Sequence, residues 1–186
     1  QYVDVPEDAA RIEVVGQQWQ WTYRFPGKDG KLGTSNIRNI TDDNPFGVNP
    51  KDPNGKDDVL IDDSELHIPL GQSVKVLLRS IDVLHDFYVP EFRAKMDLVP
   101  GMITYFWFKP IRKGTFDIMC FELCGVGHHA MRGQVVVEDQ SDFDKWLGEQ
   151  ETFAQSMARA GKPLGEDTKL VSNETAPGPL SKQVVR

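Results

Sequence analysis

Apolar and polar residues alternate along much of the chain between residues 11 and 138, and this pattern predicts a protein built from β-strands. In residues 11–25, four aromatic side chains alternate with polar ones, as in a strand that has one apolar face. Ile12 and Val14 occupy positions of the opposite parity. We therefore expect one strand over residues 11–25, with a bulge at Gly16 where the apolar face changes sides.

Six shorter segments with the character of strands follow, and turn signals such as Pro100–Gly101 separate them. Pro69 ends the first of these segments, because proline has no backbone N–H to donate to a neighbouring strand. Several short strands separated by turns are typical of an all-β sandwich, in which we expect Greek-key connections. The predicted strands cover residues 65–68, 73–81, 85–89, 102–109, 114–120 and 133–138.

The segments around these strands have a different composition. Residues 26–58 contain 24 Gly, Pro, Asn, Asp or Lys, which predicts a long surface loop inserted into a sandwich that covers residues 11–140. Residues 141–160 begin with Ser, continue with acidic residues and carry an apolar stripe, so we expect one C-terminal helix. Residues 1–10 form a lead-in, and residues 161–186 are expected to be an extended or disordered tail.

The overall composition excludes several classes of protein. The chain has 186 residues, of which 39% are hydrophobic and 26% are charged, as in one globular domain with its own core. Its formal net charge of −7 argues against nucleic-acid binding and favours a basic partner. No stretch approaches the ~20 apolar residues that a membrane-spanning helix needs.

The residues with the most distinctive chemistry lie between Cys120 and Met131. Cys120 and Cys124 are the two cysteines of the chain, and His128 and Met131 follow closely. Thiolate, imidazole and thioether groups are soft ligands that suit copper, whereas hard cations prefer oxygen. Because a predicted strand ends at Cys120, we expect a loop at the rim of the sandwich to present these groups. His85, at the start of another strand, supplies a remote imidazole.

The residue types alone leave several kinds of site open. One cysteine with His and Met would form a mononuclear blue-copper site, whereas a second cysteine allows two thiolates to bridge two metals. A structural zinc site would also use two Cys and two His, but its spacing usually repeats twice. A dithiol redox pair would prefer two intervening residues to the three found here. His129 competes with His128 for the role of ligand.

The full motif resembles a known family. Residues 120–131 read Cys-x3-Cys-x3-His-x2-Met, and four further motifs lie upstream: Gln18-Trp19-Gln20-Trp21, Asp82-Val-Leu-His85-Asp-Phe, Lys95-Met-Asp97 and Pro100-Gly101. Together they closely resemble cytochrome c oxidase subunit 2 over roughly residues 11–148, apart from the long loop. The resemblance implies a cupredoxin-like fold that carries the binuclear, mixed-valence copper centre known as CuA.

The resemblance also implies a role for each residue of the motif. Cys120 and Cys124 would bridge two copper ions, and His85 and His128 would each bind one of them. Met131 would be a weak ligand of one copper, and the backbone carbonyl of Glu122 would be a ligand of the other. The Glu122 carboxylate would help to bind Mg²⁺ at the interface with subunit 1. His129 would then lie beside the site or on the surface, and His67 would be structural.

The same resemblance implies the partners. Trp19 would be the exposed ring through which electrons arrive from cytochrome c, while Trp21 would belong to the core. Asp82 and the acidic surplus would attract a cytochrome ringed by lysines. Electrons would pass to haem in subunit 1 of a proton-pumping terminal oxidase, so this chain is expected to transfer electrons without making bonds.

Some features depart from the family pattern. The family usually has an N-terminal transmembrane hairpin, and since the sequence shows no such segment we expect a trimmed chain. The loop at residues 26–58 is longer than in mitochondrial forms. We therefore expect a bacterial protein on the periplasmic face of the inner membrane rather than a mitochondrial one. Alternatives are the copper domain of a nitrous oxide reductase, which has Trp where Glu122 stands, a copper chaperone with a thioredoxin fold, and a zinc-stabilised interaction module.

Overall fold

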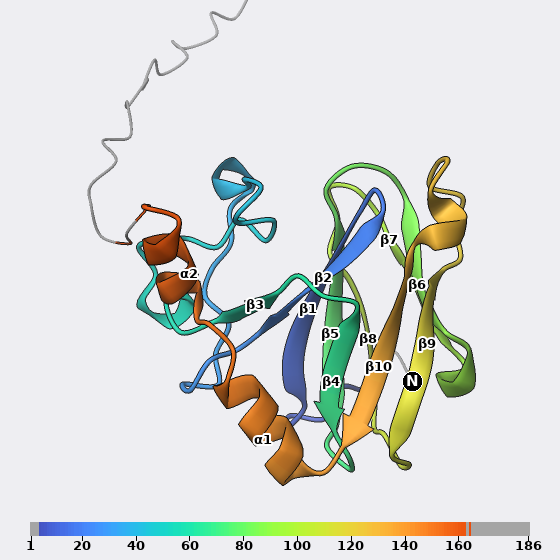
Figure 1. Ribbon diagram of the computed structural model, residues 1–186. Helices are drawn as coiled ribbons and strands as arrows, with labels where there is room; N and C mark the ends of the chain where they lie inside the picture. Colours follow the sequence, from blue (N-terminus) through green and yellow to red (C-terminus); the bar gives the residue numbers. More distant parts are fainter. Residues whose placement is uncertain (1–3, 163, 165–186) are drawn as a thin grey trace, which may run out of the picture.

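Two β-sheets pack face to face in the computed structural model, which describes residues 4–162 and 164 (Figure 1). The first sheet has the strand order β3-β2-β1-β5-β8. Its strands are β1 (Ala10–Gln17), β2 (Gln20–Phe25), β3 (Val59–Ile61), β5 (Val74–Ser80) and β8 (Thr104–Phe108). The second sheet has the order β4-β10-β9-β6-β7. It consists of β4 (Glu65–Pro69), β6 (His85–Val89), β7 (Ala94–Leu98), β9 (Gly114–Cys120) and β10 (Arg132–Glu138).

The order of the strands confirms the predicted Greek-key type of sandwich. Strands β1 and β5 are parallel, as are β10 and β4, and the other pairs are antiparallel. Alternate residues of each strand point inward, and the core between the sheets includes Trp21, Tyr23, Phe87 and Ile118. Strands β3 and β7 were not among the predicted strands. β3 is only three residues long, and β7 alternates Ala94, Met96 and Leu98 with the charged Lys95 and Asp97, the two-residue period typical of a strand.

The prediction of one strand over residues 11–25 is wrong. The segment is a hairpin in which β1 and β2 pair, with Gly16 opposite Trp21 and Gln17 opposite Gln20. Gln18 and Trp19 form the turn, so the apolar face changes parity because the chain reverses and not because of a bulge. The turn lacks the Asn-Gly or Asp-Gly signal of a short hairpin, which is why the pattern alone did not reveal it.

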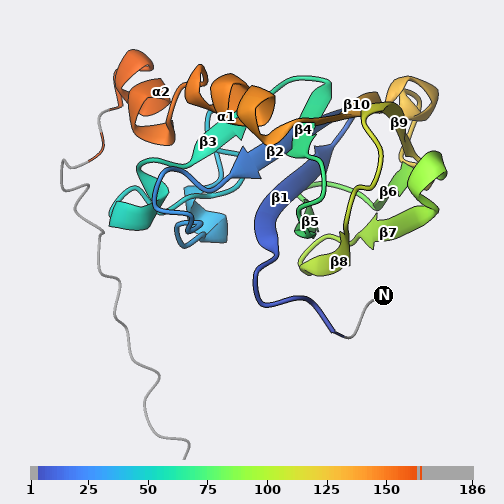
Figure 2. The same ribbon diagram turned by 90° about the horizontal axis from the view of Figure 1, so that it is seen from below.

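The predicted helical region after the sandwich is confirmed, but it is divided into two helices. Two short helices are present, α1 (Gln140–Gly148) and α2 (Phe153–Arg159), and Thr152 begins the second with a capping box. Trp146 of α1 stacks on His67 of β4, with ring centroids 4.2 Å apart, and α1 lies beside β4 (Figure 2). His67 therefore has the structural role that was expected. Most of the predicted tail, residues 163 and 165–186, lies outside the described residues.

Residues 26–58 cover the outer face of the first sheet, where they form two 3-10 turns, Ile37–Asn39 and Pro53–Gly55 (Figure 1). Phe46 and Val48 of this segment are fully buried. They pack with Val15 of β1 and Phe153 of α2 in a second hydrophobic cluster, which is separate from the core between the sheets. The polar composition predicted a surface loop, but a few apolar side chains give the segment a core of its own.

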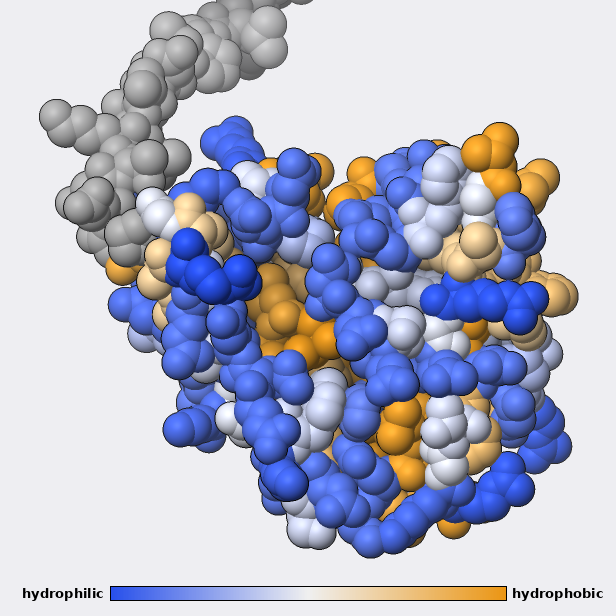
Figure 3. All heavy atoms as spheres, viewed as in Figure 1, coloured by the Kyte–Doolittle hydropathy of each residue, from blue (hydrophilic) through white to orange (hydrophobic). Residues whose placement is uncertain are grey.

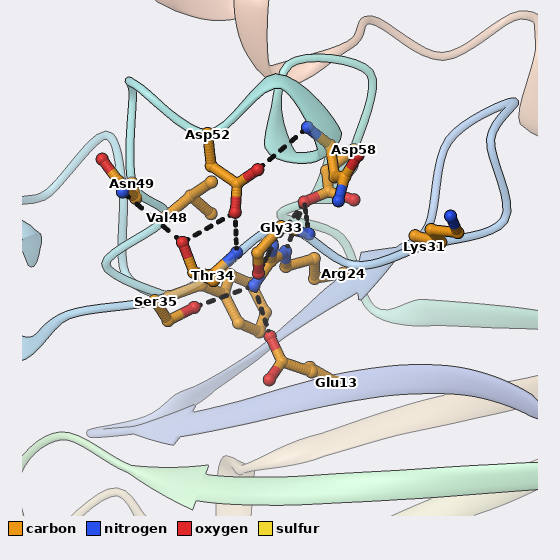
Figure 4. A network of polar contacts seen from close by, with 12 residues as sticks. Glu13, Arg24, Lys31, Gly33, Thr34, Ser35, Val48, Asn49, Asp52 and Asp58 are labelled. Carbon is orange, nitrogen blue, oxygen red and sulfur yellow. Dashed lines mark hydrogen bonds and ion pairs between the residues drawn. The ribbon is translucent and has the colours of Figure 1, made fainter.

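A buried ion-pair network joins this segment to the sheet (Figure 4). Arg24 of β2 is fully buried, and its Nη1 donates to Glu13 Oε2 at 2.7 Å. Its Nη2 donates to the carbonyl of Gly33 at 2.6 Å and also pairs with Asp58. Arg79 of β5 contacts the other oxygen of Glu13 at 2.6 Å. Burial raises the pKa of Asp58, although Arg24 opposes that effect.

Candidate metal centre

Two neighbouring strands of the second sheet bring the first donor atoms together. Strand β6 begins at His85, and β9 ends at Cys120, beside Phe87 of β6. Nδ1 of His85 lies 3.9 Å from Cys120 Sγ. Both side chains are buried, at 0% and 6% exposure. Residues 35 positions apart in the sequence therefore meet at one end of the sandwich.

The connection from β9 to β10 supplies the other donors. Cys124 Sγ lies 3.6 Å from Cys120 Sγ, 3.5 Å from His128 Nδ1 and 3.9 Å from Met131 Sδ. The Cys120 thiol donates to the backbone carbonyl of Glu122 at 3.3 Å. Cys124 is thus the centre of the cluster, in contact with three of the other donor groups.

The two thiols titrate very differently. Burial alone would raise the pKa of Cys120, but hydrogen bonds, led by that from His85, lower it to about 6. Burial and the nearby Cys120 together raise the pKa of Cys124 to about 12. The first thiolate forms easily and the second forms only with difficulty, because two buried negative charges 3.6 Å apart repel each other. A bound cation would remove that repulsion.

His85 is held in one orientation by its other ring nitrogen. Nε2 of His85 lies 2.8 Å from Asp82 Oδ1, which leaves Nδ1 facing the thiol of Cys120. Burial lowers the pKa of His85, but its contacts with Cys120 and Asp82 outweigh that effect and raise the pKa above its ordinary value. Trp21 packs edge-on to the imidazole. A carboxylate that orients a ligating histidine in this way is typical of metal sites.

The donor set fits copper. Three sulfur atoms and two imidazole nitrogens face one another, and the groups of His85, Cys120 and Cys124 all lie within 4.8 Å of one another. Soft ligands of this kind suit copper, whereas Mg²⁺ and Ca²⁺ require oxygen. The two adjacent cysteine sulfurs each lie near a different imidazole.

The hairpin turn between β1 and β2 lies against the ligand loop. The Trp19 indole N–H donates to the backbone carbonyl of Cys124 at 3.3 Å, and the Gln18 amide donates to the same carbonyl at 2.8 Å. The Trp19 ring lies so close to Gly127 that a Cβ there would come within 2.3 Å of it. Trp19 is 38% exposed. One edge of this ring therefore meets solvent while the ring contacts the backbone of the site.

The structure places the remaining candidate residues around this cluster. His129 is exposed, and the Glu122 side chain is partly exposed next to Cys120. Asp82 accepts from the backbone N–H of Gln18 at 2.6 Å and also faces His85, so it joins the hairpin turn to the histidine. The sequence did not reveal the contact between Gln18 and Cys124, because no spacing rule relates residues 106 positions apart.

Exposed apolar side chains surround the site. Phe121, Leu123 and Val126 of the ligand loop are 58%, 80% and 86% exposed. In Figure 3, apolar residues gather at the upper right, over the end of the molecule that holds this loop, on a face that is otherwise largely hydrophilic. An exposed apolar patch of this kind marks a surface that contacts a partner.

The fold and the donor cluster define a cupredoxin-like metal-binding domain. A family model described as cytochrome C oxidase subunit II, periplasmic domain, matches residues 10–139. The chain belongs to this family of periplasmic domains. Among the described residues, no helix is long and apolar enough to cross a membrane.

Similar proteins come from several bacteria. The alternative cytochrome c oxidase subunit 2 of Bradyrhizobium diazoefficiens is 59% identical over 90% of this chain and 62% of its own length. A probable cytochrome c oxidase subunit 2 of Rickettsia felis is 34% identical over 91% of this chain and 48% of its own length. The chain thus spans about half to three-fifths of these relatives.

A solved structure supports the fold. The periplasmic domain of subunit II of cytochrome oxidase (CoxB) of Bradyrhizobium japonicum superimposes with a TM-score of 0.57 at 28% sequence identity. The match covers 78% of this chain and 95% of that chain. Almost the whole of that domain is therefore matched by part of this chain.

Proposed function

We propose that this chain carries a binuclear copper centre that accepts electrons from cytochrome c and passes them to haem in subunit 1 of a proton-pumping oxidase. The observation that carries the proposal is the position of Cys124 Sγ, which contacts a second thiol, an imidazole and a thioether. This arrangement differs from a mononuclear blue-copper site, because two thiolates are available to bridge two metals. A copper pair supplies reversible one-electron chemistry when it is bound.

Six residues of this chain would be the ligands of the copper centre, in different roles. Cys120 and Cys124 would bridge the two ions, while His85 and His128 would each bind one. Met131 and the carbonyl of Glu122 would be the weak ligands, both already next to a cysteine sulfur. Because most of these donors are buried and hydrogen-bonded, their positions change little when the charge of the centre changes.

The surroundings of the site support the proposed partners. Trp19 is partly exposed and contacts the carbonyl of Cys124, so an electron carrier that docks on the hairpin turn comes close to the ligands. Asp82 and the net charge of −7 favour a cytochrome with surface lysines. The Glu122 carboxylate lies beside the exposed apolar loop, where it would help to bind Mg²⁺ against subunit 1. The periplasmic location of the matching family supports a position at the outer face of a bacterial inner membrane.

The decisive experiment is an electron paramagnetic resonance spectrum of the copper-loaded protein, with the copper-to-protein ratio measured on the same sample. One unpaired electron shared over two copper nuclei, at two coppers per chain, is the expected result. A mononuclear pattern at one copper per chain would refute the binuclear site. A colourless protein that binds only zinc would refute electron transfer as well.

Asp82→Asn is expected to weaken copper binding by about 10–100-fold, as is typical when the partner of a ligating histidine is replaced. The amide keeps the size of the side chain but can no longer act as a charged acceptor for Nε2 of His85. Competition with a copper chelator measures the change. Asp62→Asn is a matched control, because Asp62 contacts Gln20 and no donor group; an equal loss in both variants would contradict the role of Asp82.

Trp19→Phe is expected to slow electron transfer from cytochrome c several-fold and to leave the copper spectrum almost unchanged. The smaller ring loses the indole N–H that contacts the carbonyl of Cys124, but no ligand is altered. Stopped-flow reduction by cytochrome c gives the rate. Trp107→Phe, at the opposite end of the sandwich, is the control, and an unaltered rate in Trp19→Phe would make Trp19 a packing residue only.

Met131→Leu is expected to keep two coppers per chain and to alter the reduction potential. Met131 is fully buried against Cys124, and leucine fills a similar volume without a sulfur atom. Voltammetry of the loaded variant measures the potential. Loss of the second copper would show that Met131 is instead required to assemble the centre.

A further inference from the structure

A cavity of about 570 Å³ lies at the end of the sandwich opposite the metal centre. This end faces the viewer in Figure 2, where the connection from β8 to β9 crosses it. The cavity is bounded by the 3-10 turn Pro90–Phe92 after β6 and by the β8–β9 connection. Its volume falls within the range of small-molecule binding sites. It shares no residue with the metal centre.

The floor of the cavity is aromatic. The rings of Phe92 and Phe108 lie 5.1 Å apart, as do those of Phe92 and Phe116. Ile111 forms part of the wall and is 91% exposed. A flat apolar group of a ligand would therefore contact three phenylalanine rings. Burying that group would remove apolar surface from water.

The rim of the cavity is basic, although the protein as a whole is acidic. Arg93, Lys109 and Arg112 line it, together with a single acidic residue, Glu91. Within residues 4–162, none of the three basic side chains forms an ion pair with a carboxylate. The guanidinium of Arg112 lies over the Phe116 ring at 5.3 Å. Three such cations attract an anion locally.

Two further features indicate a binding site at this place. The indole N–H of Trp107, a residue that lines the cavity, is buried and has no acceptor. Such a donor costs free energy unless an acceptor is bound. Arg93 has a φ of 51°, in the left-handed region that is uncommon for residues other than glycine, and it directly follows Phe92 of the cavity floor.

We infer that this cavity binds a small amphipathic anion, whose flat apolar body lies on Phe92, Phe108 and Phe116. Its carboxylate or sulfonate accepts hydrogen bonds from the arginines and the Trp107 indole. The aromatic floor alone would suit any apolar molecule, but the unpaired cations and the unsatisfied N–H select a ligand with an acceptor group. The inference does not depend on the proposed copper centre, since the two sites share no residue.

Two fluorescent probes of nearly the same shape test the inference on the full chain. Anilinonaphthalene sulfonate carries the anionic group, and N-phenylnaphthylamine lacks it. We expect one saturable site that binds the anion about tenfold or more tightly than the neutral probe, with an affinity that falls as salt is added. The indole N–H resonance of Trp107, assigned with Trp107→Phe, should shift as the anion binds.

Variants identify the groups responsible. The double variant Arg93→Gln and Arg112→Gln should lose the preference for the anion but keep the affinity for the neutral probe. Lys28→Gln with Arg38→Gln removes the same charge from the 26–58 segment and should change neither affinity. Equal binding of the two probes by the unaltered protein would overturn the inference. So would an unchanged preference in the Arg93 and Arg112 variant.

Discussion

Replacing Cys124 with serine is expected to abolish the binuclear centre. The Cys124 sulfur lies 3.6 Å from Cys120 Sγ, 3.5 Å from His128 Nδ1 and 3.9 Å from Met131 Sδ, so it contacts three other donors of the cluster. A serine hydroxyl is a hard, weakly acidic group that cannot replace a bridging thiolate. The paramagnetic resonance signal of an electron shared over two copper nuclei should disappear, and the copper-to-protein ratio should fall from two towards one.

The matched control for this variant is Met131→Leu, which removes a sulfur from the same cluster but no thiolate. The unfolding temperature of the metal-free Cys124→Ser protein should stay close to that of the unaltered chain, since the side chains are nearly the same size. A native copper spectrum in Cys124→Ser would exclude Cys124 as a bridging ligand. The proposed function would then lose the observation on which it rests.

The second large effect concerns the buried ion pairs at the outer face of the first sheet. Arg24→Met is expected to lower the free energy of unfolding by about 3–5 kcal/mol, because it leaves Asp58 buried without its cation and leaves Glu13 with Arg79 alone. Methionine preserves much of the aliphatic volume, so the effect reports on charge rather than on a cavity. Urea denaturation measures it.

The pH dependence of this variant has a definite sign. Burial already raises the pKa of Asp58, and removal of Arg24 removes the main effect that opposes it. In the folded variant, the pKa of Asp58 is then higher than it is in the unfolded chain. Its free energy of unfolding should therefore fall as pH rises through the folded pKa and recover as the solution is acidified. The deficit should thus be smaller at pH values near 5 than near 8.

Two controls separate this explanation from a general loss of packing. Arg159→Met removes an exposed arginine that pairs with Glu151, and it should change stability little. Arg24→Met combined with Asp58→Asn should be more stable than Arg24→Met alone at neutral pH. If the deficit of Arg24→Met were the same at every pH, unpaired carboxylates would not be its cause.

The sequence predicted the class of fold because apolar and polar residues alternate with a period of two in most strands. It did not predict that residues 11–25 reverse at Gln18–Trp19, since neither residue is a usual turn former. It also missed Arg24 as a buried residue. A charged side chain between Tyr23 and Phe25 reads as solvent-exposed, unless one knows that residues 33–35 and Asp58 return to cover it.

Cys120, Cys124, His128 and Met131 could be proposed as donors from the sequence because they lie at the spacing of a family motif within one loop. The sequence could not show how His85 is oriented, since that depends on Asp82 and on contacts between two sheets. Nor could it show that Trp19 lies on Gly127, because the packing follows from the hairpin. The types of donor residue could thus be predicted from the sequence. The long-range contacts that orient these residues could be found only from the structure.

The second hydrophobic cluster belongs to a part of the domain that unfolds locally at a lower free energy than the core between the sheets. Only Val15, Phe46, Val48 and Phe153 are buried in it, and they come from β1, the 26–58 segment and α2. This small cluster and the ion pairs of Arg24 together hold the segment on the sheet, so opening of the segment and α2 breaks both while β6 and β9 stay paired. Backbone amides over residues 26–58 would then exchange their hydrogens through a sub-global opening that leaves the cysteine and histidine donors in place.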